Sequence, residues 1–128
     1  MSLNPGKRQM RLLVILFLFF VSGAWSGLAM AHALLERSDP APGAVLGNAP
    51  AAVTVFFDAE LEPAFCKLIV KNQQGVKVSQ DNGDTASAGP KSLTVKLSTR
   101  AKGVYRVYWD VVSRDGHRAS GDFTFTVQ

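Results

Sequence analysis

The sequence predicts an all-β fold, a sandwich of about seven antiparallel strands of immunoglobulin-like type, and three observations lead to this fold class. Apolar residues recur with a period of two in several short segments, which is the pattern of half-buried strands. Turn signals rich in Gly, Pro, Asn and Asp separate these segments, and no segment carries the apolar stripe of a helix. The 128 residues, 47% hydrophobic and 19% charged, suit one globular domain.

Residues 1–31 are predicted to be a cleaved secretory signal peptide, separate from a domain at 32–128. Three basic residues lie among the first 11 positions, followed by ten apolar residues at 12–21 and by the small-residue cleavage motif Ala29-Met30-Ala31. The apolar run is shorter than the roughly 20 residues that span a bilayer. An uncleaved anchor is the alternative.

The positive charge of the chain belongs mostly to this leader. Of 14 basic residues, Lys7, Arg8 and Arg11 lie within it, which leaves 11 basic against 10 acidic side chains in the domain. A domain so close to neutral lacks the basic patch that nucleic acids or anionic membranes attract, so no nucleic-acid partner is expected. Export implies an oxidising compartment, yet Cys66 is the single cysteine and has no partner in the chain.

The strands are expected in the following order along the domain. A short strand near 33–35 comes first, and clear alternation then marks segments at 53–58, 66–71, 93–98, 105–113 and 122–127, with a weaker one near 76–80. In a domain this small, aromatic residues must fill much of the core, and the candidates are Tyr105, Trp109, Phe123 and Phe125. Cys66 shares a strand face with Leu68 and Val70 and is expected to be buried.

Cleavage after Ala31 would place His32 at the terminus, where its α-amine and imidazole can bind one metal ion together. The amine has a pKa near 8, so a metal ion can displace its proton at neutral pH. Asp115-Gly116-His117 supplies a carboxylate and a second imidazole at the end of the 105–113 strand. If the first strand runs beside that end, one amine, two imidazoles and one carboxylate converge.

This donor set indicates Cu(II), which favours nitrogen-rich sites and stands highest in the divalent affinity order, although zinc uses the same donors. All three methionines lie within residues 1–30, so the domain has no thioether site for Cu(I). The alternative is that His32 and His117 are exposed and incidental and that Asp115-Gly116 is an ordinary turn.

The domain also resembles a known family over essentially all of residues 32–128. His32-Ala33, Ser38-x-Pro40-x-x-Gly43 and Glu62-Pro63-x-Phe65 are similar to the CopC copper-resistance family. So is the long ending from Tyr105 to Val127, which contains Trp109, Val111-Val112-Ser113, Asp115-Gly116-His117 and Gly121-x-Phe123-x-Phe125. The layout is that of short, YobA-like, Cu(II)-only members.

The resemblance implies a cupredoxin/immunoglobulin-like sandwich in the periplasm that binds one Cu(II) through His32, Asp115 and His117. It also implies a protein that buffers or delivers copper, is not an enzyme, and has a CopD-type inner-membrane transporter as recipient; we expect a monomer. Many family members carry Phe-Ser-Glu where this chain has Phe57-Asp58-Ala59-Glu60, and a shift of one residue changes the strand face. Whether Asp58 or Glu60 supports the metal site is therefore open.

Two other functions compete with copper carriage. A terminal His with a second His also resembles the copper histidine brace of lytic polysaccharide monooxygenases, but 97 residues leave little room for the loops of a flat polysaccharide-binding surface. The second alternative is an interaction module in which the histidines bind no metal.

Overall fold

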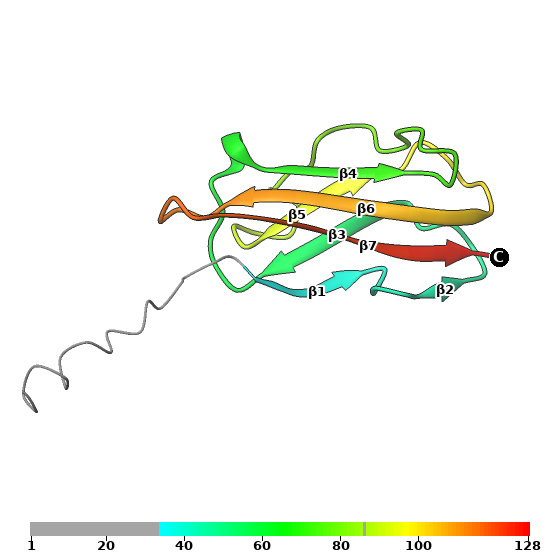
Figure 1. Ribbon diagram of the computed structural model, residues 1–128, viewed down its shortest axis with the longest axis horizontal. Helices are drawn as coiled ribbons and strands as arrows, with labels where there is room; N and C mark the ends of the chain where they lie inside the picture. Colours follow the sequence, from blue (N-terminus) through cyan, green and yellow to red (C-terminus); the bar gives the residue numbers. More distant parts are fainter. Residues whose placement is uncertain (1–33, 86) are drawn as a thin grey trace, which may run out of the picture. The chain divides into compact units, whose positions relative to one another are not determined.

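The computed structural model describes residues 34–85 and 87–128, which form two β-sheets packed face to face (Figure 1). One sheet has the strand order β1-β3-β5 and the other β2-β7-β6-β4. The strands of the described residues are β1 (Leu35–Asp39), β2 (Val45–Leu46), β3 (Ala52–Phe57), β4 (Lys67–Lys71), β5 (Ser92–Lys96), β6 (Gly103–Val112) and β7 (Arg118–Val127). The short 3-10 turn η1 (Pro63–Phe65) precedes β4. The predicted all-β sandwich is confirmed.

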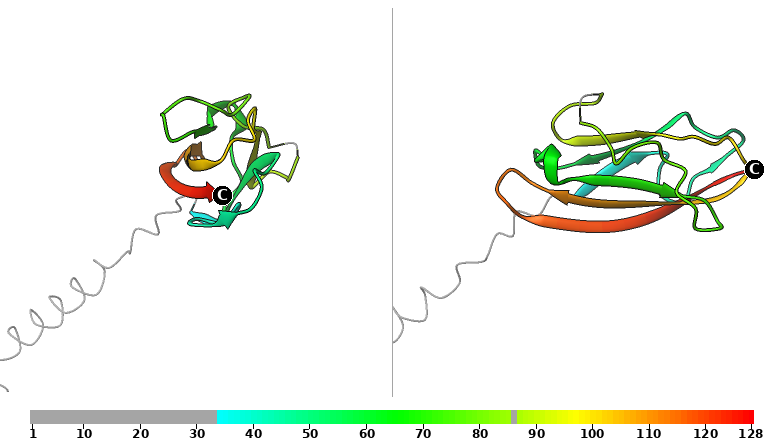
Figure 2. Two further views of the ribbon diagram at one scale, coloured as in Figure 1. Left: turned by 90° about the vertical axis from the view of Figure 1, so that its right-hand side faces the viewer. Right: turned by 90° about the horizontal axis from the view of Figure 1, so that it is seen from above.

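The longest element is the hairpin of β6 and β7, which runs the length of the sandwich (Figure 2). Ten residue pairs join its strands, from Gly103↔Val127 to Val112↔Arg118. Because this pairing has no irregularity, the loop at residues 113–117 is held at one end of the molecule by a rigid support. No helix within residues 34–85 and 87–128 is long and apolar enough to cross a membrane.

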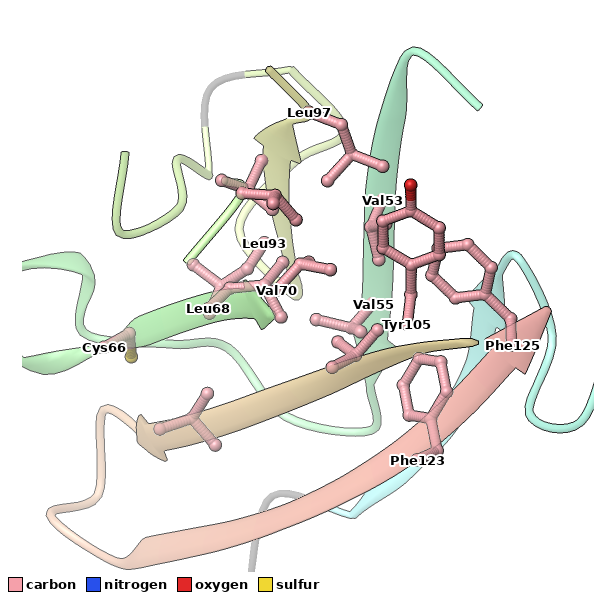
Figure 3. Packing of buried hydrophobic residues seen from close by; sticks show 14 of the residues in the cluster. Val53, Val55, Cys66, Leu68, Val70, Leu93, Leu97, Tyr105, Phe123 and Phe125 are labelled. Atoms are coloured by element: carbon pink, nitrogen blue, oxygen red, sulfur yellow. The ribbon is translucent and has the colours of Figure 1, made fainter. Parts of the chain in front are cut away.

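The core lies between the sheets and consists of the side chains on alternate positions of the strands (Figure 3). Tyr105 and Phe125 stack with ring centroids 5.1 Å apart, and both are 1% exposed. Phe123 is also buried, whereas Trp109 is only partly buried and packs edge-on against Phe57. The predicted aromatic core is thus confirmed, with Trp109 at its margin.

Trp109 reaches its position because the opposite residue on β7 is Gly121. A Cβ atom added at Gly121 would lie 2.4 Å from Cζ2 of Trp109, well inside van der Waals contact. The indole therefore occupies the space that any other residue at position 121 would fill with its own side chain.

Three short elements differ from the expectation. The first strand, expected near 33–35, is β1, which begins only at Leu35 and continues to Asp39. The predicted strand at 76–80 is wrong, because this segment bonds first to one sheet and then to the other: the Val78 amide donates to Val70 on β4, and the Gln80 amide donates to Lys96 on β5. Only isolated bridges result. Conversely, β2 was not expected, since two residues carry no alternation; it pairs in parallel with β7.

Cys66 is buried, as predicted, at 6% exposure. Its sulfur lies 3.2 Å from the carbonyl oxygen of Glu62 and accepts a hydrogen bond from the Val112 amide at 3.3 Å. Burial is the main cause that raises the pKa of this thiol above its ordinary value. The cysteine therefore packs as a small, uncharged side chain between the segment before β4 and the end of β6.

Candidate metal centre

The loop between β6 and β7 presents two of the three predicted ligands on a tightly bonded turn. The Ser113 amide donates to the His117 carbonyl at 2.9 Å, and the Gly116 amide donates to the Ser113 carbonyl at 2.8 Å. Gly116 has a φ of +88°, a conformation that other residues rarely adopt. The turn thus brings the side chains of Asp115 and His117 to the same place.

The Asp115 carboxylate accepts three hydrogen bonds. Oδ1 accepts from the Ser113 hydroxyl and from the His117 amide at 3.2 Å, and Oδ2 lies 3.0 Å from Nδ1 of His117. These donors, with the Ser113 hydroxyl the largest cause, lower the pKa of Asp115 to about 2. Asp115 is therefore ionised at any physiological pH, and a carboxylate offers about four lone pairs, so it retains capacity for a metal ion.

The contact with Asp115 also orients the His117 imidazole. A ring nitrogen bonded to a carboxylate is the usual way in which proteins fix the tautomer of a metal-binding histidine. With Nδ1 held by Asp115, Nε2 is the nitrogen through which His117 would bind a metal ion without losing this contact. Both side chains are about half exposed, at 44% for Asp115 and 50% for His117, so a metal ion can reach them from solvent.

A second ion pair supports the hairpin just before this loop. Arg118, the first residue of β7, bonds through Nε and a terminal nitrogen to both carboxylate oxygens of Asp110 on β6. This bidentate contact lowers the pKa of Asp110, chiefly through the side-chain hydrogen bond. It ties the two strands together beside the 113–117 loop.

The segment after β3 connects the loop to the start of the chain's first strand. Leu61 forms a bridge with Ser113, and the Glu62 amide donates to the Val112 carbonyl at 2.8 Å. At the other side, the Leu34 amide donates to Oδ1 of Asp58 at 2.7 Å. β1 and β6 lie in different sheets, so the first strand does not run directly beside the end of β6, and this segment bonds separately to each of them.

His32, the third predicted ligand, lies outside the described residues. Among residues 34–85 and 87–128, no group of three or more His, Cys, Asp or Glu side chains is placed to hold a metal ion. Within this part of the chain, Asp115 and His117 are thus two candidate ligands without a third side chain of these types beside them. Leu34 is two residues from His32, and two chain steps span at most about 7 Å.

Comparison with known proteins shows the family to which this chain belongs. The family model described as the CopC domain matches residues 35–128. The chain belongs to the CopC family. This is a family of copper-binding and copper-resistance proteins, and the resemblance found in the sequence is confirmed.

Individual members of the CopC family match over most of the chain. Copper resistance protein C of Pseudomonas syringae pv. tomato is 35% identical over 109 residues, covering 80% of this chain and 86% of that protein. Copper transport protein CutJ of Bacillus subtilis is 33% identical over 117 residues, but this chain spans only 21% of its length. The crystal structure of CopC from Methylosinus trichosporium OB3b has a TM-score of 0.70 and 28% identity, covering 76% of this chain and 94% of that one.

Sequence reasoning named Asp115 and His117 as candidate ligands but not the residues that hold them in place. Ser113 stands in the same motif, and a serine two residues before an acidic side chain in a turn was an available signal. The contact of Asp58 with Leu34 and the ion pair of Glu60 with Arg114 had no local signal, because each joins residues that are far apart in the chain.

Proposed function

We propose that this chain is exported to the periplasm, where it binds one Cu(II) ion through His32, Asp115 and His117 and buffers the ion or delivers it to another protein. The observation that carries this proposal is the Asp115–His117 pair on one exposed loop. The loop lies next to the segment that bonds Leu34, two residues from the proposed terminal ligand. An ionised carboxylate and an oriented imidazole together suit a nitrogen-rich site with one oxygen donor, which is the preference of Cu(II).

Delivery, not catalysis, is the proposed role. The names of its relatives refer to copper resistance and copper transport. In CutJ, the region similar to this chain is part of a much longer copper transport protein, which supports a membrane copper transporter of CopD type as the recipient. We propose a monomeric carrier with no thioether Cu(I) site, because all methionines precede position 31.

The experiment is a Cu(II) titration of protein that begins at His32, against a competing chelator, followed by electron paramagnetic resonance. One tight site with a tetragonal, nitrogen-rich spectrum is expected. Affinity should fall as the pH drops, because the amine and both imidazoles must lose their protons to bind. The matched control keeps a methionine before His32, which removes the α-amine from the chelate and should weaken binding strongly.

The two alternatives give different results in the same experiment. Weak or multiple binding by the correctly processed protein would favour an interaction module without a metal site. Oxidative cleavage of chitin or cellulose in the presence of a reductant would favour a monooxygenase. Equal affinity with and without the additional methionine would refute the role of the amine.

A further inference from the structure

We propose that the connector Asp58–Glu60 is a brace that sets the distance between the two parts of the metal site, and this inference rests on the proposed function. Within this connector, Asp58 positions the segment that follows His32, and Glu60 positions the loop that carries Asp115 and His117. Neither residue is proposed as a ligand.

The connector lies where the two sheets meet. It follows β3, which belongs to the sheet of β1, and it leads through Leu61 to Ser113 at the end of β6 in the other sheet. The predicted ligands come from these two sheets, His32 from the segment before β1 and the Asp115–His117 pair from the β6–β7 loop. The distance between His32 and the Asp115–His117 pair therefore depends on the connector Asp58–Glu60.

Asp58 holds Leu34 at both of its backbone groups. The Leu34 amide donates to Oδ1 of Asp58 at 2.7 Å, and the Asp58 amide donates to the Leu34 carbonyl at 3.1 Å. The Leu34 side chain is 61% exposed, so apolar burial does little to fix this residue. The β1–β3 pairing is also irregular between Leu35 and Arg37. The two hydrogen bonds that Leu34 exchanges with Asp58 are thus its main restraint among the described contacts.

Glu60 makes the corresponding pair of contacts with the loop. Its carbonyl accepts from the Arg114 amide at 3.0 Å, and its carboxylate forms an ion pair with the Arg114 guanidinium at 3.0 Å. Arg114 precedes Asp115 directly, so the connector is bonded to the residue before one ligand. Both side chains are about half exposed or more, so this ion pair is expected to contribute little energy by itself.

Holding Leu34 restricts where the terminal chelate can go. His32 is two residues away, a reach of at most about 7 Å, so a fixed Leu34 confines the amine and imidazole to the space around it. A site held in its binding geometry loses less conformational freedom when the metal ion arrives. Release of Leu34 should therefore lower Cu(II) affinity without removing any ligand.

The test compares Asp58→Ala with Asp58→Asn in protein that begins at His32. Alanine removes the acceptor, and we expect roughly tenfold weaker Cu(II) binding and an altered paramagnetic resonance spectrum. Asparagine keeps a side-chain oxygen for the Leu34 amide, and we expect its affinity to stay within about twofold of the unmodified protein. The matched control is Asp122→Ala, which removes an ion-paired carboxylate from Arg106 on the outer sheet face.

Two outcomes would overturn the proposal. Equal loss in the alanine and asparagine variants would mean that Asp58 acts through its charge and not by holding Leu34. Unchanged affinity and spectrum in Asp58→Ala would mean that Leu34 needs no brace.

Hydrogen exchange of the Leu34 amide in metal-free protein tests the brace separately from the proposed function. We expect this exchange to accelerate in Asp58→Ala and not in Asp58→Asn or Asp122→Ala. If the unmodified protein bound no Cu(II), the proposed function would fail, while this measurement would still support or refute the brace.

Discussion

Replacing Ser113 with alanine removes a buried hydroxyl that holds the Asp115 carboxylate in place. Ser113 is 2% exposed, and its hydroxyl donates to Oδ1 of Asp115 and lies 3.1 Å from the His117 carbonyl oxygen. This hydroxyl is the main reason why the pKa of Asp115 is about 2. We expect Ser113→Ala to raise this pKa toward the ordinary value of 3.8, only part of the way, because both contacts from His117 remain.

The loss of stability should be small and should depend on pH. Removing one hydrogen bond costs about 1 kcal/mol when its acceptors keep other donors, as both oxygens do here. For a domain of about 100 residues this lowers Tm by about 4–8 °C. The pKa of Asp115 is lower in the folded than in the unfolded chain, so its ionised form stabilises the fold above about pH 4, and this stabilisation is lost as the pH falls toward 2. The difference in Tm between the two proteins should therefore shrink over that range.

The assay combines a carbon-13 NMR titration of the Asp115 carboxyl with thermal melts from pH 7 to pH 2. Ser120→Ala on the same hairpin is the control, because that serine is exposed and lies on β7. An Asp115 titration that Ser113→Ala leaves unchanged would refute the reasoning. So would a difference in Tm that stays constant across the pH range.

Three further predictions concern the metal site and the core. His117→Ala should weaken Cu(II) binding by more than about 100-fold and Asp115→Asn by about tenfold, because a carboxylate that binds as a weak apical ligand contributes less than the imidazole. Chelator competition measures both affinities, and equal losses would contradict the apical role of the carboxylate. Gly121→Ala should destabilise the fold by about 1–3 kcal/mol in denaturant unfolding, because its Cβ would lie 2.4 Å from Trp109; an unchanged midpoint would show that the indole moves aside. Cys66 should react slowly with thiol reagents in the folded protein and quickly in denaturant, and rapid labelling of the native state would contradict its burial.

The fold could be predicted where a segment with alternating apolar residues also pairs along its length with a neighbouring strand. The alternation in β3, β4 and β5 marks strands with one face in the core, and those strands are confirmed. Residues 76–80 alternate as well, but their backbone bonds are divided between β4 and β5, a division that periodicity does not reveal. Alternation reports which side chains are buried and not which strand the backbone joins.

The candidate site likewise combines features that a local motif predicts with contacts that only the folded chain brings together. Asp115 and His117 are two positions apart in sequence, so their proximity follows from the turn at Gly116. The contacts that orient this loop relative to the first strand join Asp58 to Leu34 and Glu60 to Arg114, and only the assembled sandwich brings these residues together. The sequence was therefore enough to name candidate ligands, whereas it did not reveal the contacts that position the loop and the first strand.

The segment at residues 78–84, which bonds to both sheets, also affects whether two copies of this protein can pair through their sheet edges. β4 and β5 are edge strands, and an uncovered edge offers unpaired amides and carbonyls to the edges of other molecules. Residues 78–84 bond to both edges: Val78 and Asn82 to β4, and Gln80 and Asp84 to β5. The same seven residues thus close one side of the sandwich against edge-to-edge aggregation. Substitutions that detach residues 78–84 from either edge should therefore make the protein more prone to aggregate.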